Sequence, residues 1–296
     1  MHTTGQAFMT IRLAASGVLL LALLAPATAL ATTAQRTFVA SNGSDVHPCS
    51  LSQPCRSFAA AIAKTSSDGE VIVLDSAGYG PVTITQSVSI TAPAGIYAGV
   101  TVTSGEGIAV DGPGIVVGLR GLSINGLDIM FSNVYAIRFL HGARLWVEDC
   151  EITKLGTGIS LEAANSGVSI RNVRIHDNLY RGILVAITTG AIQVSIVDSE
   201  IANQLTGVDV SAFPATLEQV TVAHSTLTRN DTAMDVGAFA TGNASILSDR
   251  NTITYSTIVF KIDTIGIAAI FTPGNNTVGY YGTLIQGGTL SPCCGV

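Results

Sequence analysis

An eight-residue pattern recurs along the middle of the chain. Its copies occupy residues 117–124, 145–152, 168–175, 194–201 and 220–227. A second short pattern follows the copies in step, at residues 136–139, 158–161, 182–185, 207–210, 233–236 and 257–260. Because the two sets advance together, one structural unit is repeated along the chain.

Both patterns alternate apolar with polar or small residues and contain many β-branched side chains, which is typical of strands with one buried face. The segments that join them, such as residues 176–181, are too short and too polar for the crossover helices that parallel strands normally need. Coiling the chain so that each strand pairs with its own copy one turn later removes that need. We therefore predict an all-β fold, a parallel β-helix solenoid with one strand of each sheet per turn.

Other folds fit this chain less well. A leucine-rich repeat requires Leu at fixed spacing and a helical return segment, and a β-sandwich gives no reason for two patterns in step. Charged residues make up 11% of the 296 residues and hydrophobic residues 47%, which excludes a disordered chain and disfavours a helical bundle. The net charge of −6 argues against a nucleic-acid partner.

The first 31 residues have the features of a secretory signal peptide. Arg12 precedes an apolar run at residues 13–25, and Ala-x-Ala patterns follow at residues 27–31. The run is shorter than the roughly 20 apolar residues of a membrane-spanning helix. We expect cleavage after Ala31, export to the periplasm, the cell surface or the medium, and no membrane span in the mature protein.

Five cysteines suit an oxidising compartment. Cys49 and Cys55 bracket a short loop and are expected to form a disulfide, whereas Cys150 falls inside a repeat and is expected to be a buried thiol. The pairing of Cys293 and Cys294 stays open. No His lies at ligand spacing from a cysteine pair, so we expect no zinc site.

A short amphipathic helix is expected at residues 56–64, because Phe58, Ala61 and Ile62 share one helical face. Such a helix would cover the first coil, whose strand edges and apolar interior need protection. We assign residues 32–68 to this N-terminal cap, 69–279 to the β-helix and 280–296 to a C-terminal tail that covers the last coil or stays loose.

The segments at residues 117–125, 145–152 and 158–159, with the opening at 37–44 and the end at 274–278, resemble the right-handed β-helix proteins that bacteria export, in the pectin-lyase-like superfamily. The resemblance spans residues 37–279 and implies right-handed coiling and export. The calcium-binding Asp cluster and catalytic Arg of pectate lyases have no clear counterpart in this chain. The sequence motifs of polygalacturonases are also missing.

Stacking the repeats brings equivalent outward side chains about 4.8 Å apart. One column contains Arg120, Glu148 and Arg171, and another contains Glu151, Arg174 and Glu200. We interpret both as ladders of ion pairs, with a polar substrate groove as the alternative. Two further polar columns are expected to shape turns, with metal binding as the less favoured alternative: Asp149, Asn172, Asp198 and His224 in one, and Asn178, Asn203 and Asn230 in the other.

Asp209 and Asp235 take the same outward position in consecutive coils. Two carboxylates at such spacing would suit a retaining glycosidase, or a calcium ion as in pectate lyases. The same column is expected to hold Arg138, Ser160, Leu184 and Val259, which provide no second base and no converging cations. We therefore favour two solvated surface carboxylates, with catalysis as the alternative.

Trp146 is the single tryptophan and points outward by alternation, so it could stack on a sugar beside Glu148 and Arg171. Phe213 and Phe239 hold equivalent positions in adjacent coils and are expected to stack inside. We predict a secreted, non-catalytic protein, either a surface-binding protein or an envelope scaffold, with polysaccharide or a cell-surface component as its partner and no cofactor. The alternative is a polysaccharide lyase or glycoside hydrolase acting on acidic polysaccharide, for which calcium is a candidate.

Overall fold

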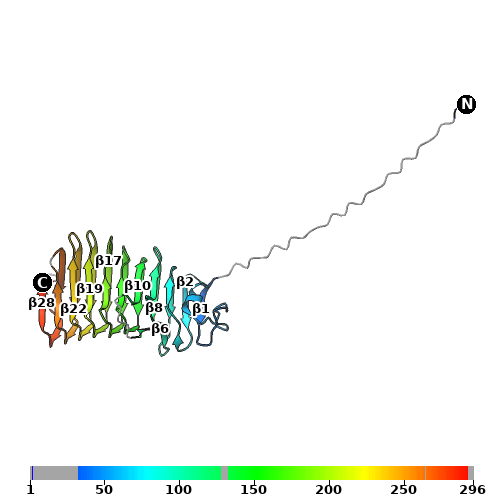
Figure 1. The fold of residues 1–296 in the computed structure, drawn as a ribbon, viewed down its shortest axis with the longest axis horizontal. Helices are drawn as coiled ribbons and strands as arrows, with labels where there is room; N and C mark the ends of the chain where they lie inside the picture. Colours follow the sequence, from blue (N-terminus) through cyan, green and yellow to red (C-terminus); the bar gives the residue numbers. More distant parts are fainter. Residues whose placement is uncertain (1, 3–32, 128–132, 264, 293–296) are drawn as a thin grey trace. The chain divides into compact units, whose positions relative to one another are not determined.

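The structure is a computed structural model that describes residues 2, 33–127, 133–263 and 265–292. The unit formed by Thr32–Val296 is an all-β solenoid of about eight turns, built from three parallel sheets (Figure 1). This confirms the predicted fold class. The expected signal peptide lies outside the described residues.

We name the sheets A, B and C in the order in which a turn of the chain visits them. Sheet A has eleven strands in the order of their numbers. They are β1 (Ala34–Val39), β2 (Thr65–Val73), β5 (Val88–Thr91), β8 (Val116–Arg120), β11 (Arg144–Glu148), β14 (Ser166–Arg171), β17 (Ala191–Val197), β20 (Leu217–Ala223), β23 (Asn243–Asp249), β26 (Ile267–Thr272) and β29 (Ser291–Pro292).

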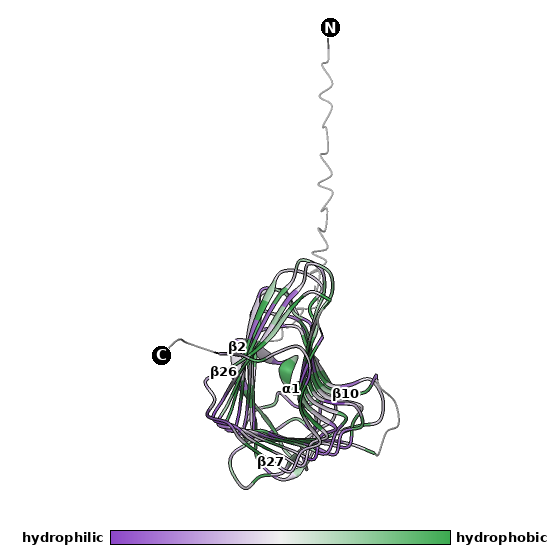
Figure 2. Cartoon of the chain, turned by 90° about the vertical axis from the view of Figure 1, so that its left-hand side faces the viewer, coloured by the Kyte–Doolittle hydropathy of each residue, from purple (hydrophilic) through white to green (hydrophobic). Residues whose placement is uncertain are grey.

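Sheets B and C have nine strands each. Sheet B contains β3 (Ala77–Gly78), β6 (Ala98–Val102), β9 (Leu122–Gly126), β12 (Glu151–Thr153), β15 (Arg174–His176), β18 (Glu200–Ala202), β21 (Thr226–Thr228), β24 (Thr252–Thr254) and β27 (Thr277–Gly279). Sheet C contains β4 (Val82–Ile84), β7 (Glu106–Asp111), β10 (Tyr135–His141), β13 (Thr157–Leu161), β16 (Arg181–Val185), β19 (Thr206–Ala212), β22 (Thr232–Ala238), β25 (Ile258–Ile262) and β28 (Thr283–Gly287). Figure 2 looks along the solenoid, with β26 of sheet A, β27 of sheet B and β10 of sheet C on three different sides.

Each coil contains three strands rather than the two segments visible in the sequence. The eight-residue pattern divides into a sheet A strand and a sheet B strand, as at β11 and β12. The first of the two residues between them has a left-handed backbone, with φ between 51° and 54° at Asp149, Asn172, Asp198 and His224. Asn and Asp tolerate this conformation better than most residues, so the prediction that this column shapes turns is confirmed.

Side chains just inside these turns are linked from coil to coil. The Val173 amide donates to Ser199 Oγ at 3.2 Å, and the Ser199 amide donates to Ser225 Oγ at 3.1 Å. The Ser225 amide donates to Asn251 Oδ1 at 2.9 Å. Each step spans 26 residues. This inner ladder satisfies amides that the sharp turn removes from the sheet hydrogen bonds.

The apolar interior follows strand alternation. Ile196 is fully buried and pairs with Ile170 in the preceding coil and Val222 in the next. Cys150 is also buried, is not bonded to another cysteine, and burial raises the pKa of its thiol to about 12. Both expectations from the repeat are confirmed.

The helix α1 (Phe58–Ile62) lies within the expected 56–64 segment and packs on β1, β2 and β4. Its buried Phe58 ring lies 5.2 Å from that of Tyr79. Ser57 caps the helix by accepting a hydrogen bond from the Ala60 amide. This covers the interior of the first coils, as Figure 2 shows.

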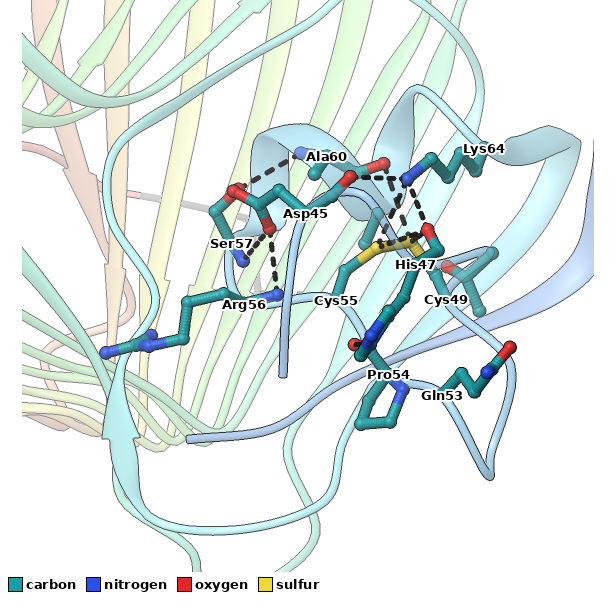
Figure 3. Close-up of a disulfide and its surroundings, with 12 residues drawn as sticks. Asp45, His47, Cys49, Gln53, Pro54, Cys55, Arg56, Ser57, Ala60 and Lys64 are labelled. Carbon is teal, nitrogen blue, oxygen red and sulfur yellow. Dashed lines mark hydrogen bonds between the residues drawn. A yellow bond between two sulfur atoms is a disulfide. The ribbon is translucent and has the colours of Figure 1, made fainter. Parts of the chain in front are cut away.

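A disulfide joins Cys49 and Cys55, as expected, and braces the loop before α1 (Figure 3). Asp45 accepts hydrogen bonds from the Arg56 and Ser57 amides at 2.8 and 2.9 Å. Lys64 donates to the carbonyl oxygen of Asp45 at 2.7 Å and also to that of His47. Hydrogen bonds of one anionic side chain, Asp45, and one cationic side chain, Lys64, therefore link the disulfide loop to the helix.

At the other end, strands continue beyond residue 279, where the sequence suggests a tail. β28 pairs with β25, and β29 pairs with β26, both in parallel. Residues 280–292 thus extend sheets A and C by one strand each. Cys293 and Cys294 lie outside the described residues.

Candidate functional site

A groove of about 590 Å³ runs along the outer face of sheet A. Trp146, 38% exposed, stands on β11, and Phe271 occupies the same column five strands further along the sheet. We call this hollow the Trp146 groove. Its outward-facing lining residues are Arg144, Trp146, Gly167, Ser169, Gln193, Ser195, Gln219, Thr221, Ser245, Leu247 and Phe271.

The floor of the Trp146 groove is formed by two columns of outward residues between the aromatic ends. One column places Ser169, Ser195 and Thr221 on directly paired positions of β14, β17 and β20. The other places Gln193 beside Gln219. None of these five side chains forms a hydrogen bond with another described residue. Their donors and acceptors are therefore available to a ligand.

Glu148 and Arg171 are close to this groove but do not line it. They occupy one column with Arg120, as the sequence predicts, yet the expected pairing within that column is wrong. Arg120 donates to Asp149 at 2.9 Å, and Arg171 lies 3.7 Å from Asp198, because the carboxylates in the turns point back toward these cations. Glu148 lines a smaller hollow of about 260 Å³ on the other side of Trp146.

The second charged column forms the expected ladder. Arg174 lies between Glu151 and Glu200, at 3.7 and 3.2 Å. All three side chains are well exposed, so each pair stabilises the fold by about 0 to 1 kcal/mol.

Asp209 and Asp235 lie side by side on β19 and β22, in the same register as the sequence predicts. They line a cleft of about 220 Å³ on the outer face of sheet C, with Arg181, Lys261 and Phe239. Arg181 donates to Asp209 at 2.5 Å, and Ser211 donates to the other oxygen of Asp209 at 2.8 Å. Lys261 donates to Asp235 at 2.8 Å. We call this site the Asp209–Asp235 cleft.

The expectation of two solvated carboxylates is wrong. Asp209 is 7% exposed and Asp235 is mostly buried, and a cation contacts each of them. The column continues to Lys261 rather than to Val259, because β25 pairs with β22 two residues later than the sequence pattern suggests.

One oxygen of Asp235 stands out in this cleft. Its Oδ1 is buried and accepts no hydrogen bond from the described residues. Burial raises the pKa of Asp235, against the lowering effect of Lys261, and the nearby Asp209 adds to the rise. Asp235 is thus easier to protonate than an ordinary aspartate.

Calcium does not fit this cleft. Ca²⁺ takes six to eight oxygen ligands, whereas three of the four carboxylate oxygens here already accept hydrogen bonds from Arg181, Ser211 and Lys261. Among all described residues, no three His, Cys, Asp or Glu side chains gather closely enough to hold a metal ion.

The Asn residues at the turn between sheets B and C belong to two columns rather than one. The Asn178 side chain donates to Gln204 Oε1, and the backbone amide of Gln204 donates to Asn230 Oδ1. These three residues therefore form a buried ladder. Asn203 lies one column outward, has φ of 59° and donates to Asp177 at 2.9 Å. Both columns shape the turn.

Phe213 and Phe239 do pack together, with ring centroids 5.9 Å apart and ring planes tilted by 32°, but they are 40% and 49% exposed rather than inside. They lie on the loops that follow β19 and β22. Phe239 contributes the apolar wall of the Asp209–Asp235 cleft.

Two features of the sites could have been found in the sequence. Lys261 follows Asp235 by 26 residues, as Asp235 follows Asp209, so the constant coil length identifies it. Glu218 has the same strand parity as Val220 and Val222, which places it inside the solenoid, where it is fully buried.

Residues 86–278 match the model of the family described as the right handed beta helix region. The chain belongs to this right-handed β-helix family. The resemblance seen in the sequence is therefore confirmed at the level of fold. A comparison with curated protein sequences finds no match.

Two solved structures are similar to this right-handed β-helix. The crystal structure of pectate lyase Pel9A has a TM-score of 0.63 and 13% identity, covering 86% of this chain and 78% of that one. A rhamnogalacturonan lyase has a TM-score of 0.54 and 12% identity, covering 76% and 75%. At such identity, the similarity is one of fold.

The described residues contain no helix long and apolar enough to cross a membrane. The Cys49–Cys55 disulfide and the pectate-lyase-like fold are consistent with an extracellular protein.

Proposed function

We propose that this right-handed β-helix is an exported protein that binds polysaccharide along the Trp146 groove without cleaving it. The observation that carries the proposal is the set of outward hydroxyl and amide side chains that have no partner among the described residues. The charged side chains Arg120, Arg174 and Arg181, in contrast, are already paired. An aromatic ring beside free hydrogen-bonding groups suits a sugar chain, which presents both apolar faces and hydroxyls.

Export is part of the proposal. Residues 1–31 would direct it and be removed, and the disulfide before α1 would form on the outside of the cytoplasmic membrane. The domains would then be the cap at residues 32–68, the β-helix and the C-terminal segment. Mass spectrometry of the secreted chain tests the cleavage after Ala31.

Affinity electrophoresis of the mature protein through gels containing different polysaccharides tests the binding. Trp146→Ala should weaken binding by about tenfold or more, as expected for loss of an aromatic anchor. The control is Tyr281→Ala, which removes an exposed ring outside the groove and should leave binding unchanged. Equal retardation of the two variants would contradict the assignment of the groove.

A second candidate function is cleavage of polysaccharide in the Asp209–Asp235 cleft. It is favoured by the raised pKa of Asp235 and by its unpartnered Oδ1, which together suit a general acid. The neighbouring Asp209 carboxylate would stabilise developing positive charge at the sugar. The fold that the chain shares with two polysaccharide lyases adds support for carbohydrate as the substrate class.

Turnover on polyuronides and bacterial exopolysaccharides, with and without calcium, distinguishes the two functions. Activity that Asp235→Asn abolishes would establish the enzyme and overturn the non-catalytic proposal. The control is Asp111→Asn, which removes an exposed carboxylate on β7 of the same sheet, outside the cleft.

A further inference from the structure

We infer that the Trp146 groove accepts a neutral, hydroxyl-rich glycan chain rather than a polyuronate. This inference depends on the proposed polysaccharide binding and specifies its ligand. Among the residues that line the groove, Arg144 is the single charged side chain. A polyuronate carries a carboxylate on every sugar unit, and recognition of carboxylates in proteins relies on Arg and Lys donors.

The positive charge of Arg144 is not repeated along the groove. In the following coils, the positions paired with Arg144 are occupied by uncharged residues, namely Gly167, Gln193, Gln219 and Ser245. A polyanion extending along the axis would therefore find one cation at one end. The net charge of −6 adds a general repulsion for such a ligand.

The other arginines near the groove are already engaged. Arg120 pairs with Asp149, and Arg171 pairs with Asp198, in the column next to Trp146. Redirecting either one toward a ligand would leave its carboxylate partner without a cation. These residues do not supply a second row of charges for a polyuronate.

The groups that are free match hydroxyls instead. A serine or threonine hydroxyl both donates and accepts, and a glutamine side chain offers an oxygen and an NH₂ group. Sugar hydroxyls likewise donate and accept, whereas an ionised carboxylate only accepts. The groove thus offers acceptors that a polyuronate carboxylate could not use.

The geometry also favours an extended chain. Ser195 and Gln193 on β17 are followed by Thr221 and Gln219 on β20, so the same pair of polar groups recurs at a step of about 4.8 Å. From Trp146 to Phe271 there are five such steps, or about 24 Å. A ligand with its own short repeat can use this translation, with an aromatic ring near each end.

The test measures binding of the mature protein to polygalacturonate, alginate and glucuronan, each compared with its carboxyl-reduced, neutral counterpart. Isothermal titration is performed at low and high salt, because attraction to a polyanion weakens with salt and hydrogen bonding to a neutral chain does not. At least one neutral polymer should bind tenfold or more tightly than its acidic parent, with little salt dependence.

A gain-of-charge variant sharpens the test. Gln219→Lys places a cation in the middle of the groove at an exposed position. It should raise the affinity for polygalacturonate severalfold at low salt, and the gain should disappear at high salt because salt screens the added charge. The control, Gln53→Lys, makes the same change at an exposed position of the disulfide loop, outside the groove, and should not raise this affinity.

The outcomes separate this inference from the proposed function. Tighter, salt-sensitive binding of the acidic polymers by the unmodified protein would overturn the neutral-glycan inference and leave polysaccharide binding in place. Binding of none of the polymers would overturn both.

Discussion

Glu218 is a carboxylic acid inside an apolar solenoid, and its removal should stabilise the protein at neutral pH. The side chain is fully buried on β20. Oε1 accepts a hydrogen bond from the Ile187 amide at 2.9 Å, while Oε2 has no partner among the described residues. Burial raises the pKa of Glu218 to about 8, and the nearby Asp209 contributes to the rise.

The sign of the effect follows from proton linkage. In the unfolded chain, a glutamate has a pKa of about 4.3, so between about pH 4.3 and 8 the folded state holds a proton that the unfolded state releases. Stability from this group is fully present below about pH 4.3 and is lost as the pH rises to about 8. At about 1.4 kcal/mol per pH unit, the loss by pH 7 is roughly 4 kcal/mol.

Glu218→Gln keeps the shape and an oxygen for the Ile187 amide but cannot ionise. Urea unfolding of the variant and the parent is measured between pH 4 and 8, and the variant should lack the decline of about 4 kcal/mol. For a chain of this size, about 4 kcal/mol corresponds to a change of roughly 10 °C in melting temperature. The melting temperature of the variant minus that of the parent should therefore be roughly 10 °C larger at pH 7 than at pH 4. Glu148→Gln, at a partly exposed carboxylate three strands of sheet A earlier in the chain, is the control. Parallel stability curves for Glu218→Gln and the parent would refute the reasoning.

Three further outcomes are expected. Ile196→Asp buries an unpaired carboxylate and should prevent folding or secretion, whereas the outward Val197→Asp should be tolerated; equal soluble yields would contradict the register. Lys261→Met should cost about 1 to 3 kcal/mol in urea unfolding at pH 7 by leaving Asp235 unpaired, and adding Asp235→Asn should restore most of the loss. Cys150 should react with a thiol reagent only after unfolding, and rapid labelling of the native protein would place it at the surface.

The solenoid could be predicted because its register repeats. Ile170, Ile196 and Val222 occupy one interior column, and any single strand of this kind would have been ambiguous without its copies. The third strand of each coil stayed hidden, because the turn between the strands of sheets A and B is only two residues long, as at Asp149 and Cys150, and no loop marks it in the sequence.

The sites were harder to predict, since side-chain pairing does not follow column membership. Arg120 lies beside Glu148 in the sheet but pairs with Asp149, which the turn directs back toward it. Arg181 reaches Asp209 from a different column of the preceding strand. Such diagonal contacts depend on side-chain length and local twist, which the repeat pattern does not encode.

The 26-residue step of the inner ladder makes the coil a unit of insertion. The backbone amides of Val173, Ser199 and Ser225 each donate to the side chain 26 residues later, so duplicating a coil that begins at Ser199 or Ser225 would restore every ladder contact at both new junctions. Each added coil would lengthen the Trp146 groove by about 4.8 Å and leave its cross-section unchanged. Duplication of a coil within the gene would therefore lengthen the ligand that such a protein can bind, without changing the kinds of side chain that contact the ligand.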